Sequence, residues 1–203
     1  MRVKTETKRQ AIIDVANAAF HEAGFEGTSM SSIAARLGGS KGTLYSYFAS
    51  KEELFAAVVK QIGENHVKAI FDGLDPDGDL ETALQRFGEG FVHVICKPEL
   101  IHAYRNVLAE AGKTEVGKLF MANGPQDGQS KLATYFQHCI NLGKLRDVDA
   151  NLAAHQLIAL LKAEIHEPLM MAVLPPPTPA EIKQLVKRAL SLFLSGYAIA
   201  QPT

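Results

Sequence analysis

The sequence predicts an all-α protein, and three observations support that fold class. Apolar residues make up 47% of the 203-residue chain, aromatic residues only 7%, and tryptophan is absent. Alanine and leucine are common, which favours helices over a β-sandwich. No stretch alternates apolar and polar residues for long enough to indicate a strand, and glycines, prolines and capping residues divide the chain into segments of helical period. We expect a three-helix N-terminal domain over residues 1–50 and a larger helical domain over residues 51–203.

The N-terminal domain is expected to contain three helices, and a fourth helix is expected to link it to the larger domain. Thr7 and Gln10 match the capping-box pattern at the start of the first helix, and Gly24 ends that helix. Apolar residues recur at helical spacing in each of the following segments. The expected bounds are Thr28 or Ser29 to Gly38-Gly39, Ser40 to Phe48, and Ser50 to about Phe71, the last opened by a capping box of Ser50 with Glu53.

The larger domain is expected to hold six further helices. Residues 72–79 consist mostly of aspartate, glycine and proline and are expected to form a loop. Pro168 is expected to kink a long helix, because proline cannot donate a backbone hydrogen bond. Thr178, Pro179 and Glu181 supply the N-cap, first-turn proline and third-position carboxylate of the last helix. The expected bounds are Leu80 to about Pro98, 99–111, 114–122, 126–142, 149–171 and 179 to about 199.

Charge and cysteine content limit the possible classes of protein. The net charge of −1 excludes a polyanion binder that relies on bulk positive charge. Residues 1–60 carry a net charge of +2 and residues 61–203 a net charge of −3, which indicates an anionic partner for the N-terminal part. Two cysteines, Cys96 and Cys139, are too few for a disulfide framework and indicate a reducing compartment. With no leader and no run of about 20 apolar residues, we expect a cytoplasmic protein without a membrane partner.

The segment 28–51 predicts a helix-turn-helix, because a short helix, a glycine-containing turn and a second short helix follow one another. In that motif the second helix lies in the major groove of DNA and its N-terminal residues reach bases and phosphates. Hydroxyl groups, one lysine and a glycine gather at the start of the predicted third helix, whose N-terminus also favours a phosphate. We expect contacts with double-stranded DNA from Thr28, Ser29, Ser40, Lys41, Gly42, Thr43, Tyr45, Tyr47 and Lys51.

Three stretches of this segment follow a specific pattern. Residues 24–34 read Gly-Phe-x-x-Thr-Ser-Met-x-x-Ile-Ala, residues 40–48 read Ser-Lys-Gly-Thr-Leu-Tyr-x-Tyr-Phe, and residues 51–54 read Lys-Glu-x-Leu. In these positions the chain resembles the TetR family of bacterial transcription regulators. The resemblance implies a dimeric repressor with a small-molecule pocket in its C-terminal helices. Two departures are Gly39, where an apolar residue often stands, and a third helix in which Lys41 is the single cation.

Residues 79–199 resemble the C-terminal domain of the AefR-like branch of that family. The similarity is carried by Gly-Asp-Leu at 78–80, Arg-x-Val-x-x-Glu-Ala at 105–111 and Leu-Phe-Leu-x-Gly-Tyr at 192–197. We therefore expect a ligand-binding and dimerisation domain.

Two predicted helices, 149–171 and 179–199, are apolar on more than one side, which indicates burial on two sides. A second copy of the chain would bury the outer side, giving a four-helix homodimer interface; a central core helix is the alternative reading, especially for 149–171. A mostly apolar cavity with a few polar groups suits a small-molecule effector. Its expected lining residues, which could equally be plain core, are Phe87, Phe91, Tyr104, Phe120 and His155.

The alternatives are an enzyme and a carrier protein. Glu99 and His102 form one Glu-x-x-His pair, whereas helical di-iron sites use two such pairs. Because phosphate-binding loops, nucleophile elbows and Cys–His clusters are also absent from the sequence, we expect no enzyme and no cofactor. We expect a ligand-responsive transcriptional regulator, most simply a repressor that a small molecule releases from a palindromic operator. A helical carrier without sequence-specific DNA binding is the competing hypothesis.

Overall fold

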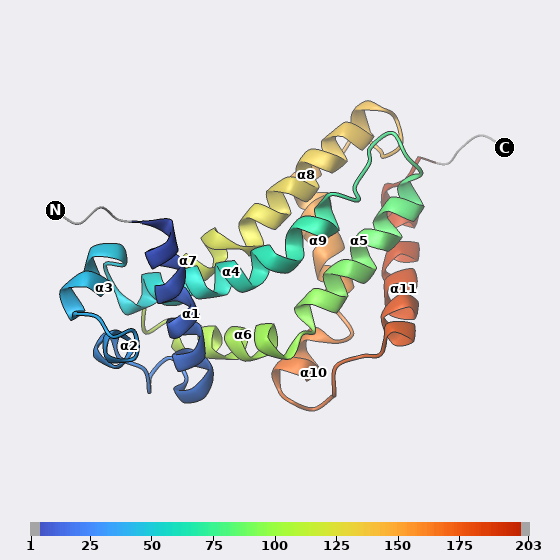
Figure 1. Cartoon of the computed structure of the whole chain (residues 1–203). Coiled ribbons are helices and arrows are strands. Elements are labelled where there is room, and N and C mark those ends of the chain that lie inside the picture. Colours follow the sequence, from blue (N-terminus) through green and yellow to red (C-terminus); the bar gives the residue numbers. More distant parts are fainter. Residues whose placement is uncertain (1–4, 200–203) are drawn as a thin grey trace. The chain divides into compact units, whose positions relative to one another are not determined.

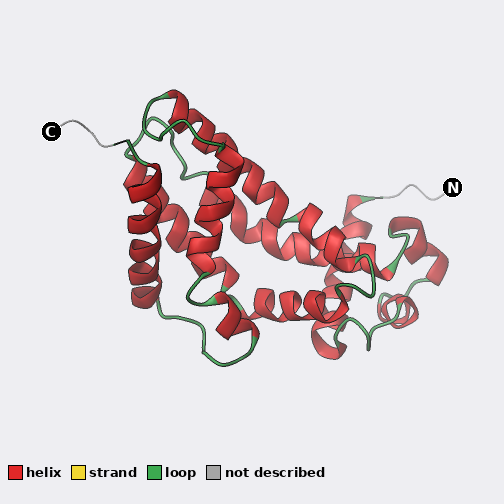
Figure 2. Ribbon diagram, turned by 180° about the vertical axis from the view of Figure 1, so that it is seen from behind, coloured by secondary structure: helices red, strands yellow, loops and turns green. Residues whose placement is uncertain are grey.

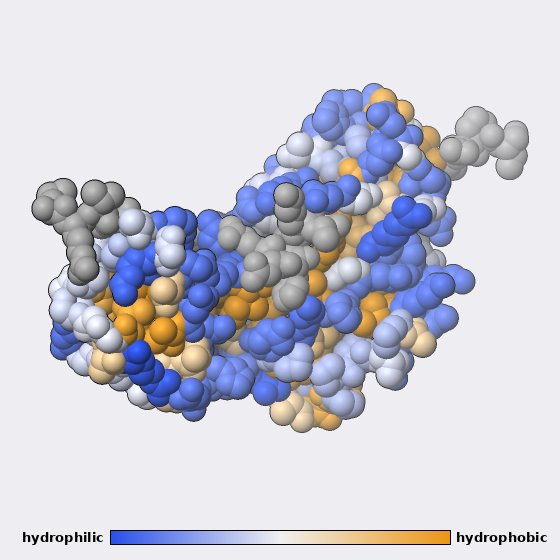
Figure 3. Space-filling view, in the orientation of Figure 1, coloured by the Kyte–Doolittle hydropathy of each residue, from blue (hydrophilic) through white to orange (hydrophobic). Residues whose placement is uncertain are grey.

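The structure is a computed structural model that describes residues 5–199, apart from the side chains of residues 63–69 and 123. Within this range it contains eleven α-helices and no β-strand (Figure 1, Figure 2). The all-α prediction is therefore confirmed. Polar side chains cover most of the molecular face drawn in Figure 3, and apolar side chains show between them.

The helices pack into two compact units. The first unit contains the described residues up to Gly63 together with His102–Gly124, and the second contains Glu64–Ile101 together with the described residues from Pro125 onward. Helices α4 (Lys51–Phe71) and α6 (Pro98–Glu110) each contribute residues to both units. This division differs from the predicted boundary near residue 50, because residues far along the sequence complete the packing of the N-terminal helices.

Helix α1 (Glu6–Ala23) begins earlier than the sequence pattern suggested. Its N-cap is Thr5, whose side chain accepts a hydrogen bond from the backbone N–H of Lys8. Gln10 donates to Asp14 over 2.8 Å instead of completing a capping box with Thr7. The predicted cap at Thr7 is therefore wrong, since a second threonine two residues earlier could cap an extra half turn.

The remaining helices of the first unit surround an apolar core. Three rings lie at its centre: Phe20 and Phe25 each meet Phe55 nearly edge to face, with centroid distances of 4.9 and 5.2 Å. Ala103, at the start of the first unit's share of α6, packs into the same core. Besides α1 and the shared helices, this unit contains α2 (Met30–Arg36), α3 (Lys41–Tyr47) and α7 (Val116–Asn123).

The second unit is a bundle in which α5 packs against α9 and α11. A side chain at Gly88 of α5 would place its Cβ 2.6 Å from Val186 and 3.1 Å from Leu161, so the close approach of these helices requires glycine. Phe136 and Phe193 stack in the interior with their ring centroids 5.4 Å apart. The helices are α5 (Leu80–Ile95), α8 (Pro125–Asn141), α9 (Ala150–Lys162), α10 (His166–Met170) and α11 (Pro179–Tyr197).

The predicted single helix over 149–171 is wrong, because the structure divides it into α9 and α10. The break falls before Pro168, between Lys162 and His166. A proline ring clashes with the carbonyl group four residues earlier, which here belongs to Glu164. Pro168 then lies in the first turn of α10, where a missing N–H costs little.

The predicted start of the last helix is confirmed. Thr178 is the N-cap of α11, and Thr178 and Glu181 form a reciprocal capping box. The helix ends at Tyr197, two residues before the expected end.

Candidate nucleic-acid interface

The N-terminus of α3 is built by a local hydrogen-bond network. Ser40 is the N-cap, and its Oγ accepts a hydrogen bond from the backbone N–H of Thr43 over 3.1 Å. The hydroxyl groups of Ser40 and Thr43 lie 2.9 Å apart and share a hydrogen bond. The start of the predicted third helix is therefore confirmed, and both hydroxyls are held at the helix end that favours an anion.

Helix α3 presents one polar face and one apolar face. Leu44 and the C-cap residue Phe48 are buried in the first unit's core. Lys41, Tyr45 and Ser46 are exposed, with Tyr45 retaining 49% of its accessible surface. Since residues four apart lie on one side of a helix, these side chains and Gly42 form one exposed stripe, which we call the α3 face. Ser46 was not among the predicted contacts, although its spacing from Gly42 could have suggested it.

Gly42 has no conformational reason to be glycine. It is exposed within a helix, and a Cβ built there would meet only Ser40 Oγ, at 3.8 Å. Because glycine in a helix costs roughly 0.5–1 kcal/mol relative to alanine, the chain gives up stability at a position where an outside surface can approach the backbone.

The two tyrosines of α3 have different roles. The hydroxyl of Tyr47 accepts a hydrogen bond from the backbone N–H of Thr5 over 3.1 Å, and its ring packs against the first unit's core. Tyr45 has no such bond to any described residue and projects from the α3 face. Of the two predicted contacts, Tyr45 is thus the accessible one, and Tyr47 holds α3 against the start of α1.

Thr28 and Ser29, predicted together as phosphate contacts, are placed differently. Ser29 is exposed at the N-cap of α2 and forms a reciprocal capping box with Ser32. Thr28 is only 3% exposed, and its hydroxyl donates to the carbonyl oxygens of Ala19 and Gly24 over 3.1 and 2.8 Å. The predicted phosphate contact by the Thr28 side chain is wrong, because its one proton serves buried acceptors.

Lys51 is also held by the protein itself. Its Nζ donates to the carbonyl oxygen of Phe25 over 2.9 Å and lies 4.0 Å from the centroid of the Phe25 ring. The ammonium group thus joins the start of α4 to the segment between α1 and α2, which lies 26 positions earlier in the sequence. It keeps two further N–H donors, so a phosphate contact would be additional to this structural role.

The turn between α2 and α3 is a glycine C-cap. Gly38 adopts a left-handed conformation with φ of 66°, and the N–H of Gly39 bonds to the carbonyl oxygen of Ala34 over 3.1 Å. Leu37 packs against the core just before this turn, and a Cβ at Gly39 would lie 3.8 Å from its side chain. Leu37 therefore supplies an apolar contact beside Gly39, where the TetR pattern often has an apolar residue.

One further cation of the helix-turn-helix was missed. Arg36, the last residue of α2, pairs with Glu22 over 2.8 Å, and both side chains are largely exposed. An exposed ion pair contributes only about 0–1 kcal/mol, so Arg36 can exchange Glu22 for a phosphate at little cost. Basic residues at a helix end are the signal that could have identified it.

The five residues predicted to line an effector pocket do not come together as one set. Phe87 and Phe91 stack in the second unit with their centroids 5.9 Å apart, whereas Tyr104 and Phe120 meet edge to face in the first. His155 is exposed on the side of α9 that carries Leu152 and points away from the core. Its assignment to an interior cavity is therefore wrong.

The described residues were also considered as a possible membrane span and as a possible metal site. None of the helices in the described part of the chain is both long and apolar enough to span a membrane. Across the same residues, no three His, Cys, Asp or Glu side chains gather in a way that could hold a metal ion.

Comparison with known proteins identifies both parts of the chain. Residues 12–58 match the family model for bacterial regulatory proteins of the tetR family. Residues 82–199 match the model for the C-terminal domain of AefR-like transcriptional repressors.

Solved structures agree along nearly the whole chain. A TetR-family regulator from Mesorhizobium loti is 27% identical, with a TM-score of 0.85, and the alignment covers 98% of this chain and 100% of that one. A TetR-family regulator from Pseudomonas syringae is 30% identical, with a TM-score of 0.71 and coverage of 98% and 100%. The transcriptional regulator YezE of Bacillus subtilis is 30% identical over 80 residues, which cover 39% of this chain and less than half, 41%, of YezE.

These proteins are transcription regulators and not enzymes, and the family consists of DNA-binding regulators that respond to small molecules. From its helix-turn-helix to its last helix, the chain belongs to the TetR family of bacterial transcription regulators.

Proposed function

We propose that this regulator binds a palindromic operator as a homodimer in the cytoplasm, with α3 in the major groove. The observation that carries the proposal is the α3 face, on which Lys41, Gly42 and Tyr45 are exposed while Leu44 is buried on the other side of the helix. Two such helices must lie about 34–36 Å apart to enter successive turns of one side of DNA. With Lys41 as the single cation of α3, sequence preference would depend on hydroxyl groups, water and DNA shape more than on arginine–guanine pairs.

The proposed dimer uses the outer sides of α9 and α11. Leu152 on α9 and Leu192 on α11 keep 52% and 62% of their accessible surface, on helices whose other sides are buried in the second unit. Exposed leucines on neighbouring helices suit the middle of an interface between two copies. Arg188, paired with Glu164, and Lys187 are polar residues that suit its rim.

We also propose that a small molecule bound in the second unit controls DNA affinity. Helices α4 and α6 run from one unit into the other, so a shift of either helix in the second unit is passed on covalently to the first. A ligand that lowers operator affinity tenfold must favour the unbound conformation by about 1.4 kcal/mol. Release of a repressor is the simplest form of this control.

Selection of binding fragments from random DNA, followed by gel shifts at moderate salt, tests the proposal. The regulator should enrich sequences with two inverted half-sites about ten base pairs apart and retard them as a complex with two protein chains. A carrier protein would enrich no sequence, and that result would reject the proposed DNA-binding function.

A further inference from the structure

The ammonium group of Lys162, the last residue of α9, has no anionic partner among the described residues. The side chain is half-buried, and its Nζ lies 6.0 Å from the centroid of the Phe91 ring on α5. The described residues give it this ring contact but neither a hydrogen bond nor an ion pair. Burial lowers the pKa of the amine, and none of their carboxylates offsets that effect. An anion from outside the chain would therefore stabilise the charged form of Lys162.

The described neighbours of Lys162 in the sequence do not supply this anion. Burial and the charge of Lys162 both lower the pKa of His166, the first residue of α10, which places a second basic group nearby. Glu164 lies between the two, but it accepts hydrogen bonds from Arg188 of α11, over 2.9 Å from Nε and 2.5 Å from Nη2. The break between α9 and α10 thus carries two basic groups, and the carboxylate between them is bound to another helix.

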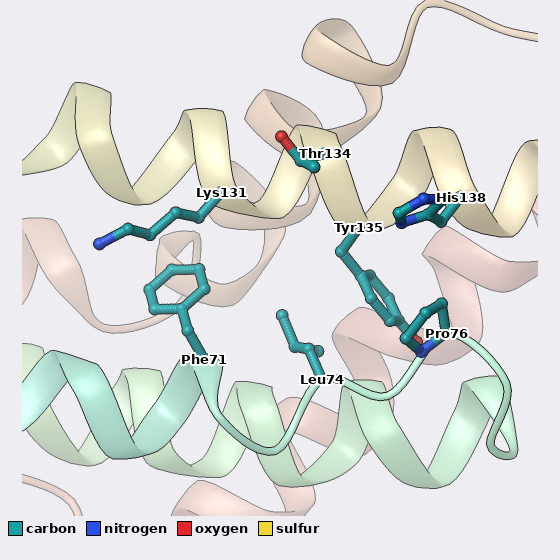
Figure 4. Close-up of a pocket in the computed structure, with 7 residues that line it drawn as sticks. All are labelled: Phe71, Leu74, Pro76, Lys131, Thr134, Tyr135 and His138. Atoms are coloured by element: carbon teal, nitrogen blue, oxygen red, sulfur yellow. The ribbon is translucent and has the colours of Figure 1, made fainter.

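A second lysine of the same unit has the ring contact and also its own carboxylate. Lys131 Nζ lies 5.9 Å from the centroid of the Phe71 ring, nearly the distance between Lys162 and Phe91 (Figure 4). It also lies 2.7 Å from Asp127. Lys131, Phe71 and Tyr135 help to line a pocket of about 340 Å³ between α4, the following loop and α8, which was not predicted from the sequence. Since the lysine of that pocket is already paired, the stronger attraction for an anion is at Lys162.

A row of phenylalanine rings connects Lys162 to α4. Phe91 stacks on Phe87 at a centroid distance of 5.9 Å, and Phe87 meets Phe71 of α4 edge to face at 5.3 Å. Phe87 is buried, whereas Phe91 is half-buried and keeps part of its ring accessible. An apolar group can therefore pack on Phe91 while an anion pairs with Lys162. A displacement of Phe91 would then be passed through the rings to α4.

We propose that Lys162 and Phe91 bind a small organic carboxylate with an apolar body. The carboxylate pairs with the ammonium group, and the apolar body covers the accessible part of the Phe91 ring. One negative charge matches one ammonium group, whereas a phosphate monoester carries almost two. That such a carboxylate is the effector rests on the proposed function, whereas its binding does not.

Isothermal titration calorimetry with matched probes tests the binding. The probes are hexanoate with hexanamide, 4-phenylbutanoate with 4-phenylbutanamide, and acetate, which lacks an apolar body. We expect at least one of the two longer carboxylates to bind the wild-type protein about tenfold more tightly than its amide, as a hydrogen bond to a charged group would provide. Acetate should bind more weakly than that carboxylate, because it leaves Phe91 uncovered. Absence of binding, or no preference for a carboxylate over its amide, would overturn the proposal.

Two lysine variants assign the charge. Lys162→Met should reduce the affinity for the preferred carboxylate to that for its amide and leave the amide affinity unchanged. Lys131→Met is the matched control, because it removes a lysine at nearly the same distance from a phenylalanine ring. It should change neither affinity. A preference that survives in Lys162→Met, or is lost in Lys131→Met, would place the carboxylate elsewhere and reject the site.

Urea denaturation without a probe distinguishes a ligand contact from a structural role. Lys162→Met removes a half-buried charge but no ion pair and no hydrogen bond to a described residue. The midpoint of unfolding should therefore stay at the wild-type urea concentration or rise. A clear decrease of the midpoint would show that Lys162 stabilises the fold through a partner within the protein, and would overturn the proposal.

A gel shift with the selected operator separates the site from its role. Loss of the retarded band on addition of the preferred carboxylate, but not in Lys162→Met, would support the effector role. Calorimetric binding with an unchanged band would reject that role and keep the site. Failure to bind any operator would reject the proposed function and leave the calorimetric result in force.

Discussion

The phenolic oxygen of Tyr47 accepts a hydrogen bond from the backbone N–H of Thr5, at a distance of 3.1 Å. This bond joins the last residue of α3 to the residue that caps α1, across 42 positions of sequence. Tyr45, two residues earlier, is on the exposed α3 face instead. The pair separates a residue that positions the recognition helix from one that is free to contact DNA.

Replacing each tyrosine with phenylalanine tests this separation. Tyr47→Phe should lower the free energy of unfolding by about 0.5–1 kcal/mol, because an exposed hydrogen bond is lost. Tyr45→Phe should leave the free energy of unfolding unchanged and weaken operator binding several-fold. Urea denaturation and gel shifts measure the two effects; a stability loss in Tyr45→Phe with unchanged binding would contradict the assignment.

Gly42→Ala should make the protein more stable and a poorer DNA binder. A Cβ at this position meets nothing closer than 3.8 Å, so the helix should gain roughly 0.5–1 kcal/mol. The added methyl group would separate the backbone from a phosphate and reduce operator affinity. Gly128→Ala in α8 is the control, because its Cβ would make ordinary contact with Phe71 at 3.6 Å and should stabilise without changing DNA affinity. Undiminished affinity of the Gly42 variant would mean that the backbone does not approach DNA there.

Lys41 and Lys51 should respond differently to truncation. Lys41→Ala should leave stability unchanged and reduce the slope of log affinity against log salt by about 0.9, as one lost phosphate contact would do. Lys51→Ala should lower the free energy of unfolding by about 1 kcal/mol, since the bond to the Phe25 carbonyl and the ring contact are lost. Salt titrations of both variants measure the slopes, and an unchanged slope for Lys41→Ala would remove its phosphate contact.

Thr28→Val should destabilise the first unit more than Ser29→Ala does. Valine keeps the shape of threonine but removes the hydroxyl group that donates to the carbonyl oxygens of Ala19 and Gly24, a loss of about 1–3 kcal/mol. Ser29→Ala removes only an exposed helix cap, a loss of about 1 kcal/mol. Chemical denaturation of the two variants gives the order, and a smaller loss for Thr28→Val would show that its hydroxyl is not structural.

The capping box of α11 should make stability depend on acid pH. Hydrogen bonds from the backbone and side chain of Thr178 lower the pKa of Glu181 below its ordinary value of 4.5. A carboxyl group with a lowered pKa in the folded state stabilises the protein above its unfolded pKa, and that contribution is lost as the pH falls through the folded value. The destabilisation by Glu181→Gln should therefore be largest near neutral pH and shrink below pH 4.5. Thermal unfolding of the wild type and of Glu181→Gln, at neutral pH and below pH 4.5, measures this destabilisation. A destabilisation that does not change with pH would show that the charge of Glu181 does not contribute to the cap.

Local features of α3 could be predicted from the sequence because they depend on residues close together in the chain. Ser40 as the cap and Leu44 and Phe48 as core residues follow from spacing alone. The role of Lys51 could not be predicted, because its acceptor is a backbone carbonyl 26 residues away that carries no sequence signal. Thr28 likewise matched a family pattern, but only the fold shows that its hydroxyl turns inward.

Longer-range features were predicted less well for the same reason. The effect of Pro168 was recognised, but its clash acts four residues upstream and divides the helix there. The pocket beside Tyr135 combines residues 71–76 with residues 131–138, and periodicity cannot show that two such segments meet. Candidate pocket residues chosen by residue type alone were therefore divided between the two units.

The sharing of the first unit's core with Ala103, Val107 and Val116 has a consequence for building hybrid regulators. A fusion of helices α1–α3 of this protein to the C-terminal domain of a relative would remove these three side chains from the core that supports the helix-turn-helix. A fusion that also includes residues 102–124 keeps the first unit complete. The stable unit that contains the helix-turn-helix is thus built from two separated segments of sequence, and a hybrid needs both.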